Sequence, residues 1–90
     1  MTVRRHVYYG GRVQGVGFRY TVMRLAGARA VTGFVKNLVD GRVEVVVEGP
    51  ESEVSGLLAD VSEGMGGYVR GAEVVEEAAT GEFGEFGVRF

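Results

Sequence analysis

VYYGGRVQGVGFRYTVMRLA, residues 7–26, decides the fold because its hydrophobic period changes part-way along. The β-prone residues at its start, followed by two consecutive glycines, predict a strand over residues 4–11. From Phe18 onward the apolar residues fall at helical spacing, which predicts a helix that ends near Gly27. Residues 12–17 are then the loop that joins this strand to the helix.

The segment after this helix has the pattern of a β-hairpin followed by a second helix. We expect strands over residues 34–38 and 42–48. Asp40-Gly41 between them predicts a type I′ turn, in which both central residues have positive φ. Pro50 suits the first position of a helix, and the glycines from position 64 onward end it. The face of this helix is apolar at helical spacing: Val54, Leu57, Leu58 and Val61.

Two more strands complete the pattern, one over residues 68–76 and a short one over residues 86–90. The order is β-α-β-β-α-β with one extra short strand. We therefore predict an α+β fold, the ferredoxin-like (split β-α-β) sandwich, with an antiparallel sheet and two helices on one face. We expect residues 1–90 to form a single domain. Fold class alone does not assign a function.

The composition excludes several kinds of protein. The 90 residues include no cysteine, which excludes disulfides, thiolate metal sites and a cysteine nucleophile. A net charge of −2 argues against nucleic acid as a partner. No apolar run approaches the roughly 20 residues that cross a membrane, and no signal peptide is recognisable. We expect a cytoplasmic monomer that makes no contact with a membrane.

The loop between the first strand and the first helix has the features of an anion site. Unpaired backbone N–H groups and the helix dipole meet at a helix N-terminus, and Gly15 and Gly17 let the backbone curl around one point. Arg19 lies in the first helical turn, where a cation is disfavoured unless an anion binds beside it. Two other interpretations stay open: an ordinary tight turn, and an exposed Arg19 paired with a surface carboxylate.

Two blocks of the sequence resemble a known family. Gly11-Arg12-Val13-Gln14-Gly15-Val16-Gly17-Phe18-Arg19 resembles the first signature of the acylphosphatases. Gly33-Phe34-Val35-Lys36-Asn37, with Asp40-Gly41, Val43 and Gly49 behind it, resembles the second. The element order of the family covers the whole chain. Gly17 stands where some members carry a larger residue, and Phe34 where many carry Trp or Tyr.

The resemblance implies an enzyme that hydrolyses the carboxyl-phosphate bond of small-molecule acyl phosphates, with inorganic phosphate as product and competitive inhibitor. It implies that Arg19 binds the phosphoryl group and that Asn37 orients the attacking water. The backbone amides that assist Arg19 would come from one loop: Val13, Gln14, Gly15, Val16, Gly17 and Phe18. The resemblance implies no metal ion, no other cofactor and no covalent intermediate.

The remaining polar residues have plainer interpretations. We expect His6, the only histidine, to be structural or at the surface. We expect three glutamates to form a solvated strand face and not a metal site: Glu73, Glu76 and Glu77. Three arginines either steer an anionic substrate or are ordinary surface charges: Arg4, Arg5 and Arg12. The alternative to an enzyme is a non-catalytic ferredoxin-like module that binds RNA or a small molecule.

Overall fold

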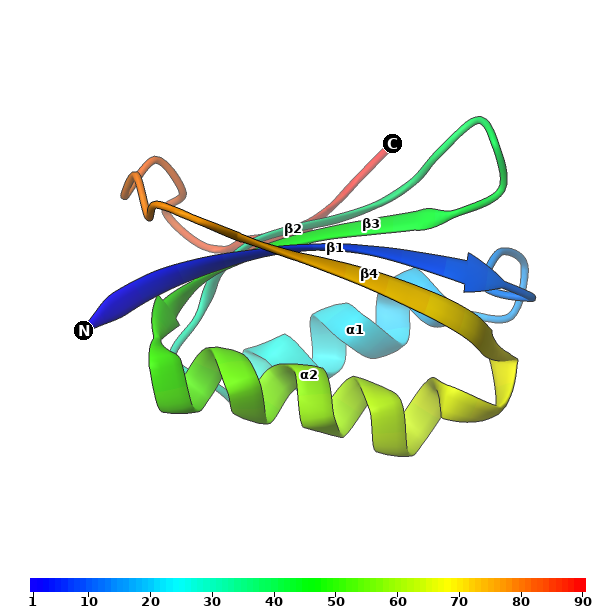
Figure 1. The fold of residues 1–90 in the computed structure, drawn as a ribbon, viewed down its shortest axis with the longest axis horizontal. Helices are drawn as coiled ribbons and strands as arrows, with labels where there is room; N and C mark the ends of the chain where they lie inside the picture. Colours follow the sequence, from blue (N-terminus) through cyan, green and yellow to red (C-terminus); the bar gives the residue numbers. More distant parts are fainter.

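A computed structural model describes all 90 residues. Two helices cover one face of a sheet, and the opposite face carries no helix (Figure 1). The elements in chain order are β1 (Thr2–Gly11), α1 (Phe18–Gly27), β2 (Thr32–Asn37), β3 (Val43–Pro50), α2 (Glu51–Met65), the 3₁₀ turn η1 (Gly66–Tyr68), β4 (Val69–Glu77) and β5 (Phe86–Arg89). The predicted ferredoxin-like α+β fold is confirmed.

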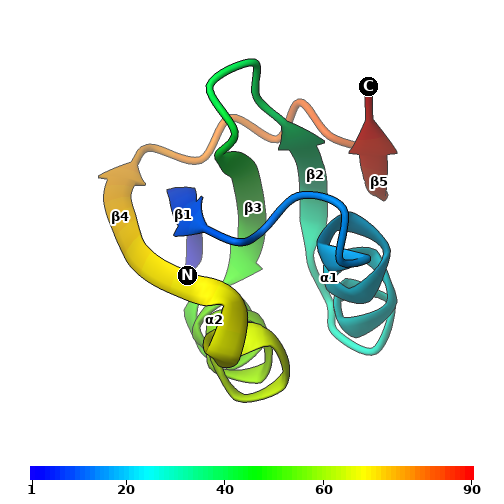
Figure 2. The same cartoon turned by 90° about the vertical axis from the view of Figure 1, so that its right-hand side faces the viewer.

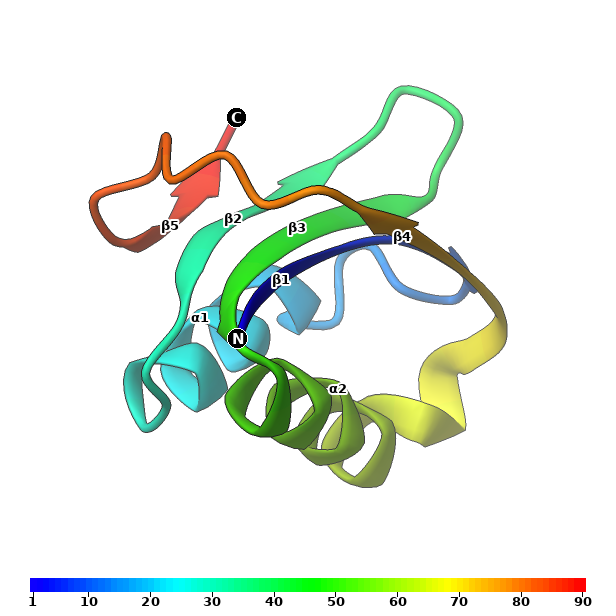
Figure 3. The ribbon, with the colours of Figure 1, turned by 60° about the vertical axis from the view of Figure 1, so that its left-hand side comes forward.

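The five strands are ordered β4-β1-β3-β2-β5 across the sheet (Figure 2). β1 pairs antiparallel with β3 and β4, and β2 pairs antiparallel with β3. β5 instead pairs parallel with β2, so the sheet is mixed at one edge and not antiparallel throughout. The reason is the path of the chain. β4 ends at the end of the sheet where β2 begins, and the chain crosses there to the far edge (Figure 3).

The core lies between the sheet and the helices, where alternate strand residues meet the apolar stripe of each helix. Val43, Val45 and Val47 of β3 are fully buried there, as their alternation predicts. The helices bury Phe18, Val22 and Ala26 from α1 and Val54, Leu57, Val61 and Met65 from α2. The helical faces predicted from the sequence are therefore confirmed, with Leu25 and Leu58 partly buried at their margins.

The turn between β2 and β3 differs from the predicted type I′ turn. Gly41 has a positive φ of 94°, but Asp40 does not. The Gly41 N–H donates to the Leu38 carbonyl over 3.1 Å, and the Asp40 carboxylate accepts from the Arg42 N–H over 3.0 Å. Asp40 thus stabilises the turn through its side chain, and its backbone does not adopt the left-handed conformation.

The boundaries of the second helix also differ from the prediction. Pro50 has the extended dihedrals φ −55° and ψ 141°, so it precedes the helix and ends β3. The helix begins at Glu51. Gly64 lies inside it, and Gly66 keeps a right-handed conformation that leads into η1.

The segment between β4 and β5 crosses the helix-free face of the sheet (Figure 3), where a buried carboxylate binds it. Glu48 of β3 is only 2% exposed. It accepts hydrogen bonds from the backbone N–H groups of Thr80 and Gly81, each over 2.9 Å, and from Arg4 Nε over 2.6 Å. Burial alone would raise the pKa of Glu48, but these donors more than offset it and lower the pKa. Arg4 is therefore part of an internal ion pair.

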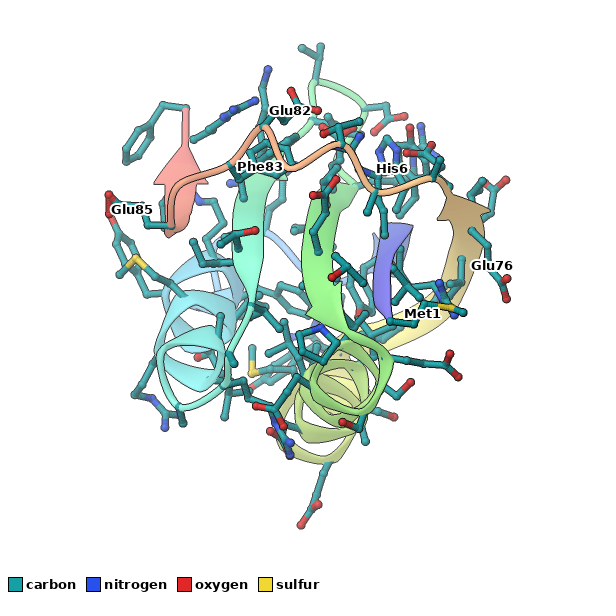
Figure 4. The ribbon with its side chains drawn as sticks, turned by 90° about the vertical axis from the view of Figure 1, so that its left-hand side faces the viewer. Met1, His6, Glu76, Glu82, Phe83 and Glu85 are labelled. Atoms are coloured by element: carbon teal, nitrogen blue, oxygen red, sulfur yellow. The ribbon has the colours of Figure 1, made fainter.

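His6, the only histidine, also lies on the helix-free face of the sheet. Figure 4 shows His6 with Glu82 and Phe83 on the side away from the helices. Its two ring nitrogens lie 2.7 Å from a Glu44 oxygen and 3.2 Å from a Glu77 oxygen. No group of acidic and histidine residues has the arrangement of a metal site. His6 therefore joins β1 to both of its neighbouring strands.

Candidate active site

A pocket of about 220 Å³ opens at the end of the sheet where β1 and β2 finish. The loop from β1 to α1 crosses this end of the sheet, beside the β2–β3 hairpin (Figures 1 and 2). Seven residues line the pocket: Val13, Gly15, Gly17, Phe18, Arg19, Tyr20 and Asn37. The structure thus brings Arg19 and Asn37, from α1 and β2, to one cavity.

The loop is anchored in the core at both ends and curved by two glycines between these ends. Val13 and Phe18 at its two ends are buried in the core, and the Phe18 ring lies 5.1 Å from the ring of Tyr9. Burial of that tyrosine raises its pKa to about 12. Between these anchors Gly15 and Gly17 have φ values of 79° and 78°, a left-handed conformation that side chains disfavour. The anchors fix the loop, and the glycines give it its curl.

This curl leaves a set of backbone donors unused. None of the N–H groups of residues 13–20 donates a hydrogen bond within the chain. α1 has no side-chain cap at Gly17 and no acidic residue in its first turn. The positive end of the helix dipole therefore adds to a group of free donors, which is the arrangement that binds a phosphate-like anion.

Arg19 makes no ion pair and no hydrogen bond within the chain, although it is partly buried. Four other arginines are paired with carboxylates: Arg4, Arg5, Arg29 and Arg42. The Arg19 guanidinium carbon instead lies 4.9 Å from the ring centroid of Phe90 and 6.0 Å from that of Tyr20. Pairing with a surface carboxylate, one of the interpretations open from the sequence, is not what the structure shows. The guanidinium donors remain available to a ligand.

Asn37 is the last residue of β2 and lines the pocket. It shares the helix-covered face of the strand with the buried Val35, two positions before it. Its side-chain amide makes no hydrogen bond within the chain, and no buried polar atom of the protein lacks a partner. The Asn37 amide is therefore open to the pocket.

Gln14 ties the loop to the hairpin. Its Nε2 donates to the carbonyl oxygens of Leu38, over 2.8 Å, and Arg42, over 2.9 Å. Gln14 and Val16 do not line the pocket, and Val16 packs against the core. Because Leu38 follows Asn37 directly, the two Gln14 bonds fix the distance between the loop and Asn37.

Sequence reasoning missed two aromatic residues at this site, Tyr20 and Phe90. Tyr20 follows Arg19 in α1 and is 55% exposed, and Phe90 follows β5 and is 84% exposed. The sequence predicts a short strand over residues 86–90 that includes Phe90. The strand of the structure ends at Arg89, so Phe90 lies outside it. Only the exposed position of Tyr20 beside Arg19 in the first helical turn could have pointed to it.

Comparisons with known proteins place the chain in a family. A sequence profile of the acylphosphatases matches residues 5–88. The chain belongs to the acylphosphatase family. It is 49% identical to the acylphosphatase of Methylococcus capsulatus over 94% of each protein. The crystal structure of the Bacillus subtilis acylphosphatase covers all of both chains with a TM-score of 0.89 and 36% identity.

One larger structure contains the same fold. Full-length HypF matches the whole chain with a TM-score of 0.89 and 26% identity, but the match covers only 12% of the HypF chain. The chain matches the smaller acylphosphatases over nearly their full length. It is therefore an acylphosphatase, a hydrolase. Neither of its helices is both long and apolar enough to span a membrane.

Proposed function

We propose that this acylphosphatase hydrolyses small-molecule acyl phosphates by direct attack of water on phosphorus. Arg19 and the amides of residues 13–18 hold the phosphoryl group, and Asn37 orients the water. One observation carries the proposal: three kinds of unpaired donor, a guanidinium, a row of backbone N–H groups and a side-chain amide, meet at one pocket. This pattern matches an anion that carries three oxygens.

The bond to be broken needs little help from the protein. The leaving group is a carboxylate, whose conjugate acid has a pKa of about 4, so it departs without being protonated. Phosphoryl transfer passes through a loose transition state, which demands little assistance from a general base. What remains is to place the water in line and to stabilise charge on the phosphoryl oxygens.

Arg19 suits this second task because its planar fork bonds two phosphoryl oxygens at once and keeps its charge at any working pH. The helix N-terminus adds fixed partial charge on the same side. Asn37 lines the pocket from β2 and offers one amide oxygen and two N–H donors to a water molecule. These groups supply the positioning and the charge that the reaction needs.

The donor set of the pocket is consistent with a reaction that needs no metal ion. None of the seven lining residues is an aspartate, glutamate, histidine or cysteine, the residues that usually bind divalent cations. We therefore expect hydrolysis of acetyl phosphate to survive exhaustive treatment with EDTA. A rate that collapses with EDTA and returns with Mg²⁺ would contradict the mechanism.

The test of Arg19 compares two variants with a matched control. Arg19→Lys keeps the charge but loses the two-pronged geometry, so it should fall nearly as far in kcat/KM as Arg19→Ala, by about 10²–10³-fold. Arg24 lies on the same helix, is exposed and forms no ion pair, so Arg24→Ala should stay within about twofold of wild type. A near-native Arg19→Lys would reduce Arg19 to a general positive charge.

A further inference from the structure

Two exposed aromatic rings lie beside Arg19. Only three aromatic side chains of the protein are exposed, Tyr20, Tyr68 and Phe90, and two of them contact the same guanidinium. Tyr20 also lines the pocket, where it is the one aromatic residue that is not buried. Large rings left in water cost free energy that burial would recover. A ligand that covers them would recover it.

The direction of the reaction says which part of a ligand reaches these rings. This step rests on the proposed function. In an in-line displacement the attacking water and the leaving carboxylate lie on opposite sides of phosphorus. Asn37 and Tyr20 enter the pocket from different elements, β2 and α1, so with the water at Asn37 we place the leaving acyl group toward Tyr20. The substituent of the leaving carboxylate then lies beside the rings near Arg19.

We propose that Tyr20 and Phe90 form an acyl-group subsite that selects acyl phosphates whose acyl group is aromatic. A flat ring stacks on Tyr20, or sits edge-to-face against it, while the phosphoryl group is held by Arg19. Acetyl phosphate has only a methyl group at this place and leaves both rings in water. The subsite therefore acts on substrate choice and leaves the bond-breaking step to Arg19 and Asn37.

The two rings differ in what their removal changes. Tyr20 lines the pocket and its ring centroid is 6.0 Å from the Arg19 guanidinium carbon, so its loss affects mainly the acyl group. Phe90 lies closer to the guanidinium, at 4.9 Å from ring centroid to guanidinium carbon, so its loss also frees Arg19 to move. Tyr20 is therefore the clean test, and Tyr20→Phe should keep the native preference because the ring remains.

The experiment measures kcat/KM for benzoyl phosphate and for acetyl phosphate with the whole protein. The ratio of the two values is compared between variants, so the different leaving abilities of benzoate and acetate cancel. An aromatic pair changes affinity about fivefold, so Tyr20→Ala should lower the benzoyl-to-acetyl ratio by about fivefold, mainly through KM for benzoyl phosphate. Any effect of Tyr20→Ala on Arg19 changes kcat/KM for both substrates alike and therefore cancels in the ratio.

Two exposed residues away from the pocket supply the controls. Met23→Ala alters the same helix and Tyr68→Ala removes an exposed ring elsewhere, and both should keep the native ratio. Circular dichroism and the melting temperature exclude a folding defect in each variant. If Tyr20→Ala keeps the native ratio, or slows both substrates equally, the subsite is wrong and the proposed function stands. A wild-type protein that hydrolyses neither substrate overturns both.

Discussion

Replacement of Glu48 by alanine gives the sharpest stability prediction. The change leaves the N–H groups of Thr80 and Gly81 without their acceptor and removes the one buried carboxylate that pairs with Arg4. Breaking a buried ion pair from one side costs about 3–5 kcal/mol. Arg4 keeps two other carboxylates nearby, those of Glu77 and Glu82, so the low end applies. We expect Glu48→Ala to lower the free energy of unfolding by about 3 kcal/mol.

Thermal unfolding followed by circular dichroism measures this loss. In a domain of this size each kcal/mol shifts Tm by roughly 4–8 °C, so Glu48→Ala should melt roughly 12–24 °C below wild type. Glu48→Gln keeps the shape and one acceptor oxygen, so it should lose less. A Tm for Glu48→Ala within about 4 °C of wild type would refute the role of Glu48 as the fastening of the β4–β5 segment.

The pH dependence of the same variants gives a second readout. The pKa of Glu48 is lowered in the folded protein, because its hydrogen bonds and Arg4 outweigh the effect of burial. Its stabilisation is therefore fully present above the unfolded-state pKa of about 4.3 and is lost as the pH falls through the lower folded-state value. The difference in stability between wild type and Glu48→Gln should narrow on acidification below about pH 4.

Two further substitutions test the loop. Gln14→Ala removes two hydrogen bonds at the surface, so it should lower the free energy of unfolding by at most about 2 kcal/mol. It should lower kcat/KM for acetyl phosphate about tenfold, because the loop loses its hydrogen bonds to the hairpin beside Asn37. An unchanged kcat/KM would show that these bonds are dispensable. Gly17→Ala should lower the free energy of unfolding by about 1–2 kcal/mol, since φ is 78° there and no atom obstructs a Cβ. Gly27→Ala, also unobstructed but helical, should raise it by up to about 1 kcal/mol in the same denaturation series.

The parts of the fold that the sequence predicts are those set by local patterns. The helical faces follow from residues three and four apart, and the hairpin from a turn pair between two alternating runs. The parallel pairing of β5 could not be predicted, because it depends on where the chain crosses the sheet after β4. That crossing is fixed by Glu48, which is distant in sequence and looks like an ordinary surface residue of an alternating strand.

The same distinction applies to the site. The loop and Arg19 could be singled out locally, as an anion site at a helix N-terminus with an arginine in an unfavourable place. Asn37 entered only through the family resemblance, since its approach to Arg19 depends on tertiary packing. Tyr20 and Phe90 were missed because an exposed ring has no periodic signature. Whether a side chain lies beside a guanidinium is decided by packing between α1 and β5, which no local pattern encodes.

The division of labour between Arg19 and Asn37 is the central claim, and one measurement on Asn37→Ala tests it. Wild type and variant are compared for kcat with acetyl phosphate and for the inhibition constant of inorganic phosphate. If Asn37 only orients water, kcat falls by about 10²–10³-fold while the inhibition constant stays within about twofold, because the phosphate contacts come from Arg19 and the loop amides. An inhibition constant raised tenfold, with hydrolysis at a comparable rate, would make Asn37 a phosphate ligand and contradict the account.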